Sequence, residues 1–498
     1  MSESPERDEQ REPLPLKDKR AVVMGLGLFG GGVAAARFLA KQGARVLVTD
    51  LRSAEQLAPS VEALAEFGDA IEFLLGEHRE EDFKSAEVIV KNPAVRADNA
   101  YVAMAVEAGA HLTSEMNLFV ERCKGELVAL TGSNGKTTTT HLLAAILQEH
   151  EKRGGPKVWL GGNLGRSLLD DLPSIGADDL VVLELSSFQL MDMDRAEISP
   201  SISLVTNITP NHLDWHKDMA EYVRAKTAIF RHAGEASAAV LNADDAITSR
   251  LADNVPGRCA WYSLQALGTR EGVCVSEGKA LASPSLIANA SAPVELFSTD
   301  ELMLPGKHNL SNALGACACA LLAGASVEAI HAAVKDFAGV EHRLEYVDTV
   351  KGVRYYNDSI ATTPESTIAA LRSFHQPISL LLGGSDKGLD YTELANEIAV
   401  TPNLRVVYVN GDIGPAMADA IHTACRARPD PARALRVENV ASFDECVERA
   451  YRTAPADSVF LMSPATASFY EFTPGEKFRN FEHRGQHFKA LVAALKLK

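Results

Sequence analysis

The stretch ELVALTGSNGKTTT, residues 126–139, joins an apolar strand to a helix through a glycine loop. Backbone N–H groups of such a loop bind phosphates, the lysine reaches the transferred phosphoryl group, and the following hydroxyl ligates Mg²⁺. Leu130 replaces the first glycine of the full GxxxxGK[ST] motif, and a surface turn is the alternative interpretation. We predict an ATP or GTP site formed by Gly132, Ser133, Asn134, Gly135, Lys136, Thr137 and Thr138.

Strands and helices are expected to alternate on both sides of this loop. Apolar runs such as DLVVLEL (179–185) and ISLVTNI (202–208) follow it, and AVVM (21–24) and ARVLVTD (44–50) precede it. Further runs of the same kind lie beyond residue 339, for example PISLLLGG and DSVFLMSP. This alternation predicts parallel sheets with helices on both faces, which is an α/β fold.

The length of 498 residues predicts about three domains. Residues 1–18 are charged and rich in proline, and are expected to form a disordered tail. The segment 264–298 is polar and irregular, so we expect a surface excursion there. The predicted domains are a Rossmann-like N-terminal domain (19–122), a central P-loop ATPase-like domain (123–339) and a Rossmann-like C-terminal domain (340–498).

The composition excludes several classes of protein. A formal net charge of −17 gives the chain no overall attraction for nucleic acid or anionic lipid. The chain contains neither an apolar run long enough to span a membrane nor a signal-peptide core, so we expect a cytoplasmic protein. The seven cysteines show no CxxC spacing, which argues against disulfides and zinc, and Cys317 and Cys319 are expected to pack in a helix.

Three further motifs at expected strand ends carry candidate functional groups. The motif GLGLFG (25–30) precedes Asp50 by 20 residues, which indicates a nucleotide or dinucleotide diphosphate, with glycines that serve only packing as the alternative. Glu184, in LELSSFQL (183–190), is placed at a strand end where it can hold Mg²⁺, with a helix cap as the alternative interpretation. His212 in NITPNHLD (207–214) and Lys226 in RAKTAIF (224–230) become candidates only because metal is expected nearby.

Taken together, these motifs resemble the Mur ligase family, the ATP-dependent amino-acid ligases of peptidoglycan precursor synthesis. The resemblance runs from Lys19 to the C-terminus. Folylpolyglutamate synthetases are similar in the central and last domains, but they would not explain the first domain. The matching motifs are TGSNGKTTT, GGNLG (161–165), LELSSFQL, NITPNHLD, RAKTAIF, LNADD (241–245), GKHNLSNALGA (306–316), EHRLE (341–345), NDSIAT (357–362), GGSDKG (383–388) and SPATAS (463–468).

The resemblance implies an amide-forming acid–amino-acid ligase. ATP phosphorylates the substrate carboxylate, and an incoming amine attacks the acyl phosphate. LELSSFQL and the first glycine loop are most similar to the branch that adds D-glutamate to UDP-N-acetylmuramoyl-L-alanine. L-glutamate or another amino acid remains the alternative. Small-molecule substrates and a monomeric state are expected.

The resemblance also assigns roles to individual residues. Lys136 neutralises the γ-phosphate, Thr137 and Glu184 hold one Mg²⁺, and His212 ligates a second. Lys226 is carbamylated and supports the second ion. Asn309 and Arg343 contact ATP, and Asp358 contacts its ribose. The expected substrate contacts are Leu28 and Phe29 at the diphosphate, Asp50 and Arg52 at the uracil, Asn163 at the muramoyl group, and Thr362, Lys387 and Ser468 at glutamate.

Some positions depart from the family pattern. Ile360 stands where a lysine is common, and FYEFTPGEKFR (469–479) is longer than the usual connection. Phe29 and the segment 92–94 also differ from the family's usual residues.

Two other classes of function are weighed against a ligase. A dinucleotide-dependent oxidoreductase would leave the third domain without a task, and a non-catalytic nucleotide sensor would keep the loops without turnover.

Overall fold

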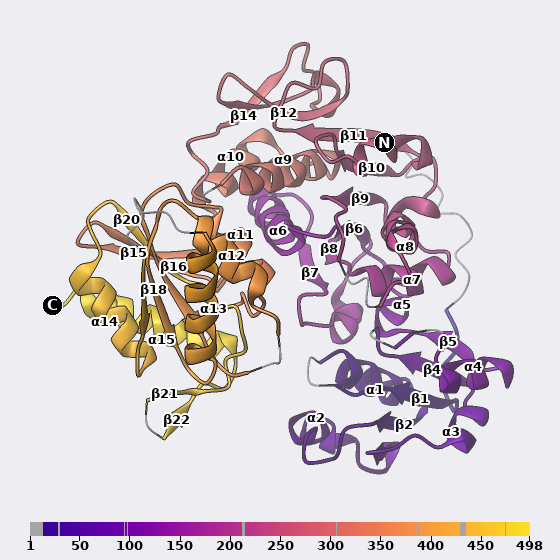
Figure 1. Ribbon diagram of the computed structural model, residues 1–498. Coiled ribbons are helices and arrows are strands. Elements are labelled where there is room, and N and C mark those ends of the chain that lie inside the picture. The colour runs from indigo at the N-terminus through magenta and orange to yellow at the C-terminus, as the bar shows by residue number, and fades with distance from the viewer. Residues whose placement is uncertain are drawn as a thin grey trace. The chain divides into compact units, whose positions relative to one another are not determined.

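The computed structural model describes residues 13–27, 30–93, 95–96, 98–211, 215–304, 306–386, 389–428, 435–473 and 475–498. The chain divides into two compact units, Met1–Glu301 with Leu310–Lys335, and Leu302–Asn309 with Asp336–Lys498. The first unit contains two large sheets and the second contains one, each with helices on its faces (Figure 1). The predicted α/β class is therefore confirmed.

The N-terminal sheet has five parallel strands in the order β3-β2-β1-β4-β5. Successive residues of a strand point to opposite faces, so Ala21 and Val23 join one buried cluster while Val22 and Met24 join another. Leu16, inside the predicted tail, is 4% exposed and belongs to the first cluster. The elements are β1 (Arg20–Met24), α1 (Gly31–Lys41), β2 (Arg45–Asp50), α2 (Ala58–Glu62), β3 (Ile71–Leu75), α3 (Glu80–Lys84), β4 (Val88–Lys91), α4 (Ala100–Glu107), β5 (His111–Thr113) and α5 (Glu115–Val120).

The second sheet of the first unit has nine strands in the order β14-β13-β12-β11-β10-β9-β6-β8-β7. The strands from β7 to β12 are parallel, whereas β13 and β14 pair antiparallel. The elements are β6 (Glu126–Thr131), α6 (Lys136–Lys152), β7 (Val158–Gly162), β8 (Leu180–Glu184), α7 (Ser187–Arg195), β9 (Ile202–Val205), α8 (Met219–Arg231), β10 (Ala238–Asn242), β11 (Arg258–Ser263), β12 (Gly272–Ser276), β13 (Lys279–Ala282), β14 (Val294–Ser298), α9 (Lys307–Leu322) and α10 (Val327–Asp336).

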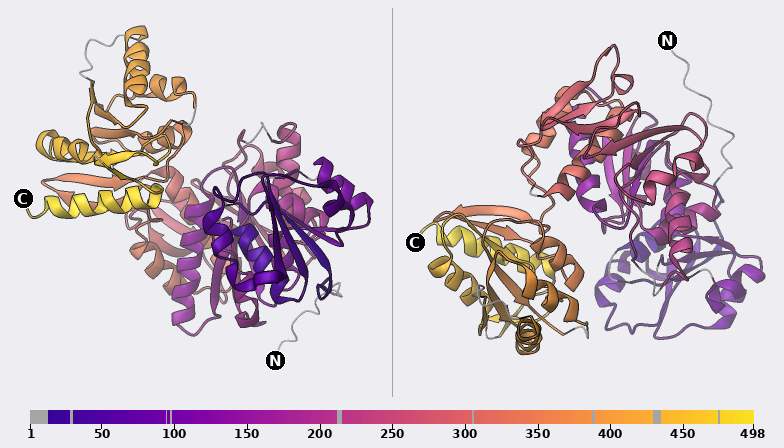
Figure 2. Two further views of the ribbon diagram at one scale, coloured as in Figure 1. Left: turned by 90° about the horizontal axis from the view of Figure 1, so that it is seen from below. Right: turned by 45° about the horizontal axis from the view of Figure 1, so that its top comes forward.

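The sheet of the second unit has six strands in the order β15-β16-β20-β17-β18-β19, and β15 alone is antiparallel. Helices α11 to α13 pack on one face, and α14 and α15 pack on the other (Figure 2). The elements are β15 (Glu345–Val350), β16 (Val353–Asn357), α11 (Pro364–Leu371), β17 (Ile378–Gly383), α12 (Thr392–Val400), β18 (Leu404–Asn410), α13 (Gly414–Ala427), β19 (Arg436–Asn439), α14 (Phe443–Thr453), β20 (Ser458–Met462), β21 (Glu471–Thr473), β22 (Glu476–Lys477) and α15 (Phe481–Leu495).

Two segments that the sequence left without regular structure, 264–298 and 469–479, contain strands. The segment 264–298 is not irregular, because β12 to β14 lie in it and extend the second sheet. The extension 469–479 includes the short antiparallel pair β21–β22. Phe472 in β21 and Phe478, directly after β22, are buried in one cluster with residues of α14 and α15. Cys317 and Cys319 are buried in α9, as predicted.

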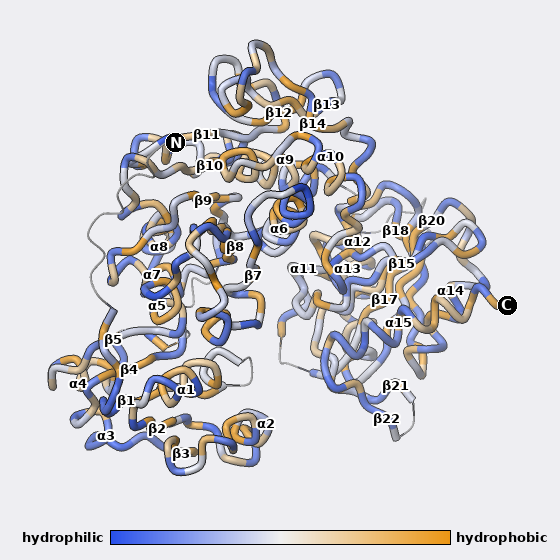
Figure 3. The backbone as a smooth tube through the Cα atoms, turned by 180° about the vertical axis from the view of Figure 1, so that it is seen from behind, coloured by the Kyte–Doolittle hydropathy of each residue, from blue (hydrophilic) through white to orange (hydrophobic). Residues whose placement is uncertain are grey.

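Hydrophobic residues concentrate in the strands and in the helices beside them (Figure 3). Strands β17, β18 and β20 illustrate this pattern. They lie inside the sheet with helices on both faces, so almost all of their residues are buried and apolar. Across the described part of the chain, no helix has both the length and the hydropathy that crossing a membrane requires.

Candidate active site

The phosphate loop lies between β6 and α6, and its glycines are required by close contacts. A Cβ on Gly132 would lie 1.8 Å from Thr206 Oγ1, and one on Gly135 would lie 2.3 Å from Asn312 Oδ1. Gly135 also has φ 81° at the start of α6, where a side chain would be strained. The loop therefore presents its backbone at the N-terminus of a 17-residue helix, an arrangement that suits phosphate binding.

The end of β9 supports this loop from the neighbouring strand. Ser133 N donates to Asn207 O at 2.8 Å, and Asn134 N donates to Asn207 Oδ1 at 2.9 Å. Lys136 Nζ donates to the loop carbonyls of Gly132 at 3.0 Å and Ser133 at 3.1 Å. The fold thus brings the beginning of NITPNHLD beside TGSNGKTTT, because β6 and β9 are neighbours in the sheet.

Glu184 ends β8 next to the phosphate loop and is 2% exposed. Its Oε1 accepts a hydrogen bond from Asn163 Nδ2 at 3.0 Å, whereas its Oε2 is buried and has no hydrogen-bond partner among the described residues. Ser186 caps α7 and forms a capping box with Gln189, so the helix-cap alternative for Glu184 is wrong. A buried carboxylate oxygen without a donor fits a cation at this edge of the sheet.

Lys226 projects from α8 toward the same edge and is 2% exposed. Its Nζ donates to Gly132 O at 2.8 Å and lies 3.4 Å from Thr131 Oγ1. Burial, aided by the charge of Lys136, lowers the pKa of Lys226 to about 6, and Glu184 offsets part of this shift. The structure therefore gathers Lys136, Glu184 and Lys226 around the phosphate loop.

The first glycine loop, between β1 and α1, is held by Asp50. Asp50 Oδ2 accepts from Gly27 N at 3.1 Å, and Oδ1 accepts from Arg52 N at 2.9 Å. Gly30 caps α1 with φ 87°, and a Cβ on Gly32 would lie 2.3 Å from Leu26 O. The acidic residue at the end of β2 thus contacts the backbone of the glycine loop at Gly27.

Asp358 lies at the end of β16 in the second unit and is buried. Its Oδ1 accepts from Leu344 N at 3.1 Å, and its Oδ2 accepts from Ser463 Oγ at 2.7 Å. Burial raises the pKa of Asp358 to about 6, although these hydrogen bonds and the charge of Arg343 oppose the rise. The structure therefore brings EHRLE beside NDSIAT. Asn309, in α9, is also buried.

Three loops of the second unit meet near Ser468. Ala465 N donates to Ala361 O at 2.9 Å, and Thr466 Oγ1 donates to Ser385 O at 2.6 Å. These hydrogen bonds join NDSIAT, GGSDKG and SPATAS, which the resemblance assigns to the acidic amino acid. Ser468 itself is buried, and Thr362 is half-buried.

Arg484 holds two of these loops and was missed by the sequence analysis. It lies in the first turn of α15, is fully buried, and donates from Nη2 to Ser359 O at 2.9 Å. Its Nη1 and Nη2 each lie 3.4 Å from Thr466 O. A signal was present, because Arg484 shares the apolar face of the helix with Phe488 and Val492 at spacings of four.

Several predicted residues lie outside the described part of the chain. They are Leu28, Phe29, His212 and Lys387, and their roles stay predictions.

Three family models match the chain in order. They are the MurD-like N-terminal domain of Mur ligases over residues 19–114, the Mur ligase middle domain over 130–320, and the Mur ligase glutamate ligase domain over 342–466. The first glycine loop lies within the first match, which removes the basis for the oxidoreductase interpretation.

Solved structures of other proteins share the fold. The ligase MurC from Thermotoga maritima aligns with a TM-score of 0.53 at 21% identity, over 96% of this chain and 99% of that chain. MurF from Acinetobacter baumannii aligns with a TM-score of 0.54 at 19% identity, over 85% and 93% of the two chains. At these identities the likeness supports the fold alone.

Curated relatives match over nearly their whole length. A protein of Roseiflexus sp. (strain RS-1), named UDP-N-acetylmuramoylalanine–D-glutamate ligase, is 42% identical over 489 residues, which is 96% of this chain and 99% of the relative. A protein of the same name from Symbiobacterium thermophilum is 37% identical over 478 residues, or 96% and 98% of the two chains. The predicted family is confirmed, and the chain belongs to the Mur ligases.

Proposed function

We propose that the chain adds D-glutamate to UDP-N-acetylmuramoyl-L-alanine with consumption of ATP, as a monomer in the cytoplasm. The observation that carries ligase chemistry is the convergence of Lys136, Glu184 and Lys226 on one phosphate loop. The choice of D-glutamate rests on the names of the relatives from Roseiflexus and Symbiobacterium.

In the proposed reaction, the substrate carboxylate attacks the γ-phosphorus of ATP, and ADP leaves. The amino group of glutamate then attacks the acyl carbon, phosphate leaves, and the amine loses a proton. Lys136 would neutralise charge on the transferred phosphoryl group.

The other predicted residues would bind the substrates. Asp50 and Arg52 would hold the uracil, Asn163 the muramoyl group, and Thr362, Lys387 and Ser468 the glutamate. Asn309, Arg343 and Asp358 would contact ATP.

Mg²⁺ would neutralise phosphate charge here, with Thr137 and Glu184 holding one ion and His212 and a carbamylated Lys226 a second. The unpartnered Oε2 of Glu184 supports a cation at this edge. The Lys226 amine is buried, and its hydrogen-bond partners among the described residues are neutral, namely the Gly132 carbonyl and the Thr131 hydroxyl. Attack of that amine on CO₂, with release of a proton, would form a carboxylate-like ligand.

Release of phosphate from ATP tests the function directly. Purified protein is given UDP-N-acetylmuramoyl-L-alanine, ATP and Mg²⁺, with D-glutamate, L-glutamate or other amino acids in separate reactions. We expect release that depends on D-glutamate. Phosphate release that depends on L-glutamate or another amino acid instead would show that this amino acid, and not D-glutamate, is the substrate. Phosphate release that depends on none of the amino acids would overturn the proposal.

Chemical rescue tests the carbamate separately. We expect Lys226→Ala to lose activity and acetate to restore part of it, because acetate supplies a carboxylate in the vacated space. Lys136→Ala is the matched control, since acetate cannot replace a lysine cation. Wild-type activity that is insensitive to removal of bicarbonate and CO₂ would contradict a carbamate.

A further inference from the structure

Arg343 lies in a strained turn of the second unit. His342, with φ 65°, and Leu344, with φ 43°, flank it in the left-handed region, which residues other than glycine rarely adopt. Such conformations persist where the surrounding structure holds them, and they cluster at binding sites. The Nε of Arg343 is buried and has no hydrogen-bond partner among the described residues. The turn therefore needs support from outside.

Glu345, the first residue of β15, is the centre of that support. Its Oε2 accepts from the backbone N–H of His342 at 2.8 Å and from Asn357 Nδ2 at 2.9 Å. Asn357 is fully buried, and its Nδ2 also lies 2.8 Å from His342 Nδ1. This amide thus links the imidazole of His342 to the carboxylate of Glu345, with Gly485 O as a more distant acceptor at 3.4 Å, and His342 is the residue just before Arg343.

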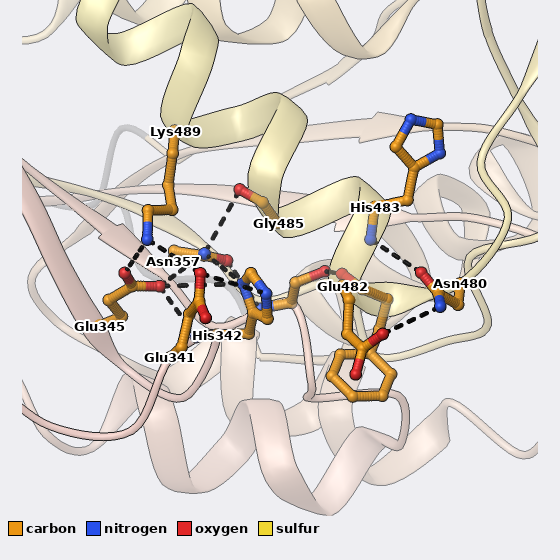
Figure 4. Close-up of polar contacts among 11 residues, drawn as sticks. Glu341, His342, Glu345, Asn357, Asn480, Glu482, His483, Gly485 and Lys489 are labelled. Carbon is orange, nitrogen blue, oxygen red and sulfur yellow. Dashed lines mark hydrogen bonds and ion pairs between the residues drawn. The ribbon is translucent and has the colours of Figure 1, made fainter. Parts of the chain in front are cut away.

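Helix α15 closes the turn from the other side. Lys489 Nζ donates to Glu345 Oε1 at 2.5 Å and to Glu341 Oε1 at 3.1 Å (Figure 4). A Cβ on Gly485 would lie 2.1 Å from His342 Nδ1, so the helix backbone approaches the imidazole at a distance that only glycine allows. The turn is held between β16 and α15.

Glu341, His342 and Glu345 could also suggest a metal site, because their ligand atoms lie within 4.8 Å of one another. Lys489 already supplies a positive charge to both carboxylates, and Asn357 already occupies His342 Nδ1 and Glu345 Oε2. The cluster is therefore satisfied by the protein itself and carries no metal proposal.

We propose that Glu345 and Lys489 are positioning residues for ATP, which hold the strained turn so that Arg343 is presented to the nucleotide. This inference rests on the proposed function for the role of Arg343. Neither residue needs to touch ATP. Loss of either one frees the turn to relax toward ordinary backbone angles, and the affinity for ATP falls while the other substrates bind as before.

The test compares ATP binding and kinetics among matched variants. Glu345→Gln keeps the side-chain shape but loses the charge, and we expect the KM for ATP to rise about tenfold. Lys489→Ala should raise it about threefold because its ion pair is partly exposed, and Lys489→Arg should restore it. Lys498→Ala is the control, since Lys498 forms an ion pair at 2.5 Å with Glu448 instead. The KM values for glutamate and the UDP-substrate should stay within about twofold.

Calorimetric titration with ATP, without amino acid, separates this inference from the proposed function. Wild-type protein that fails to bind ATP would refute the proposed function. ATP binding equal in wild type, Glu345→Gln and Lys489→Ala would refute the positioning role. A rise in all three KM values together with a lower melting temperature would also refute it, because that pattern marks a general loss of structure.

Discussion

The phosphate loop of the first unit and the loops around Ser468 in the second unit both follow parallel strands, but they are held differently. Residues 131–138 form one continuous motif, supported by the end of the adjacent strand β9. The loops around Ser468 come from three distant segments, and Arg484 from α15 joins two of them. Phosphate binding is thus encoded locally, whereas the proposed amino-acid site depends on long-range tertiary contacts.

The largest effect should follow from breaking the local motif. Lys136→Ala removes the cation of the phosphate loop, and we expect turnover to fall by about 10²–10³-fold. Lys136 is the first residue of α6, is only half-buried and bonds to carbonyls of its own loop, so the fold should persist without its side chain. Phosphate release measures turnover, and circular dichroism checks the fold. Turnover within about twofold of wild type would contradict the assigned role.

A change to the long-range contacts should instead lower stability. Arg484→Gln leaves the carbonyls of Ser359 and Thr466 without their donor, and we expect the free energy of unfolding to fall by about 4 kcal/mol. The KM for glutamate should rise more than the KM for ATP, the reverse of the pattern expected for Lys489→Ala. Urea unfolding and steady-state kinetics give both quantities.

Arg484→Lys provides the control for this change. It keeps the charge but cannot bond both loops at once, so an intermediate stability is expected. Unfolding of Arg484→Gln at the wild-type urea midpoint would show that the two loops do not depend on this side chain.

The sequence predicted the local motif better than the long-range contacts. Glycine spacing located the phosphate loop, and the end of an apolar strand located Glu184, because neighbours along the chain decide both. Arg484 and Lys489 were missed since their partners lie far away in the sequence, for example Ser359 and Glu345. The strands of 264–298 were also missed, because β13 and β14 are short and partly exposed.

A smaller effect should come from the buried carboxyl of Asp358. Its pKa is about 6 in the fold against a usual value of 3.8, so the folded state binds the proton more tightly. The corresponding stability is present below pH 3.8 and is lost as the pH rises through 6. In the wild type this loss of unfolding free energy is at most about 3 kcal/mol. Asp358→Asn has no carboxyl group to titrate, so its stability should not show this loss. Urea unfolding of both proteins from pH 4 to pH 7 measures the difference, and identical pH profiles would contradict it.

Isotope transfer shows whether D-glutamate is joined to the substrate through an acyl phosphate. UDP-N-acetylmuramoyl-L-alanine labelled with oxygen-18 in its carboxylate is incubated with the protein, ATP, Mg²⁺ and D-glutamate. We expect one labelled oxygen to enter the released phosphate for each amide formed. Amide formation with unlabelled phosphate, or no amide from D-glutamate, would contradict it.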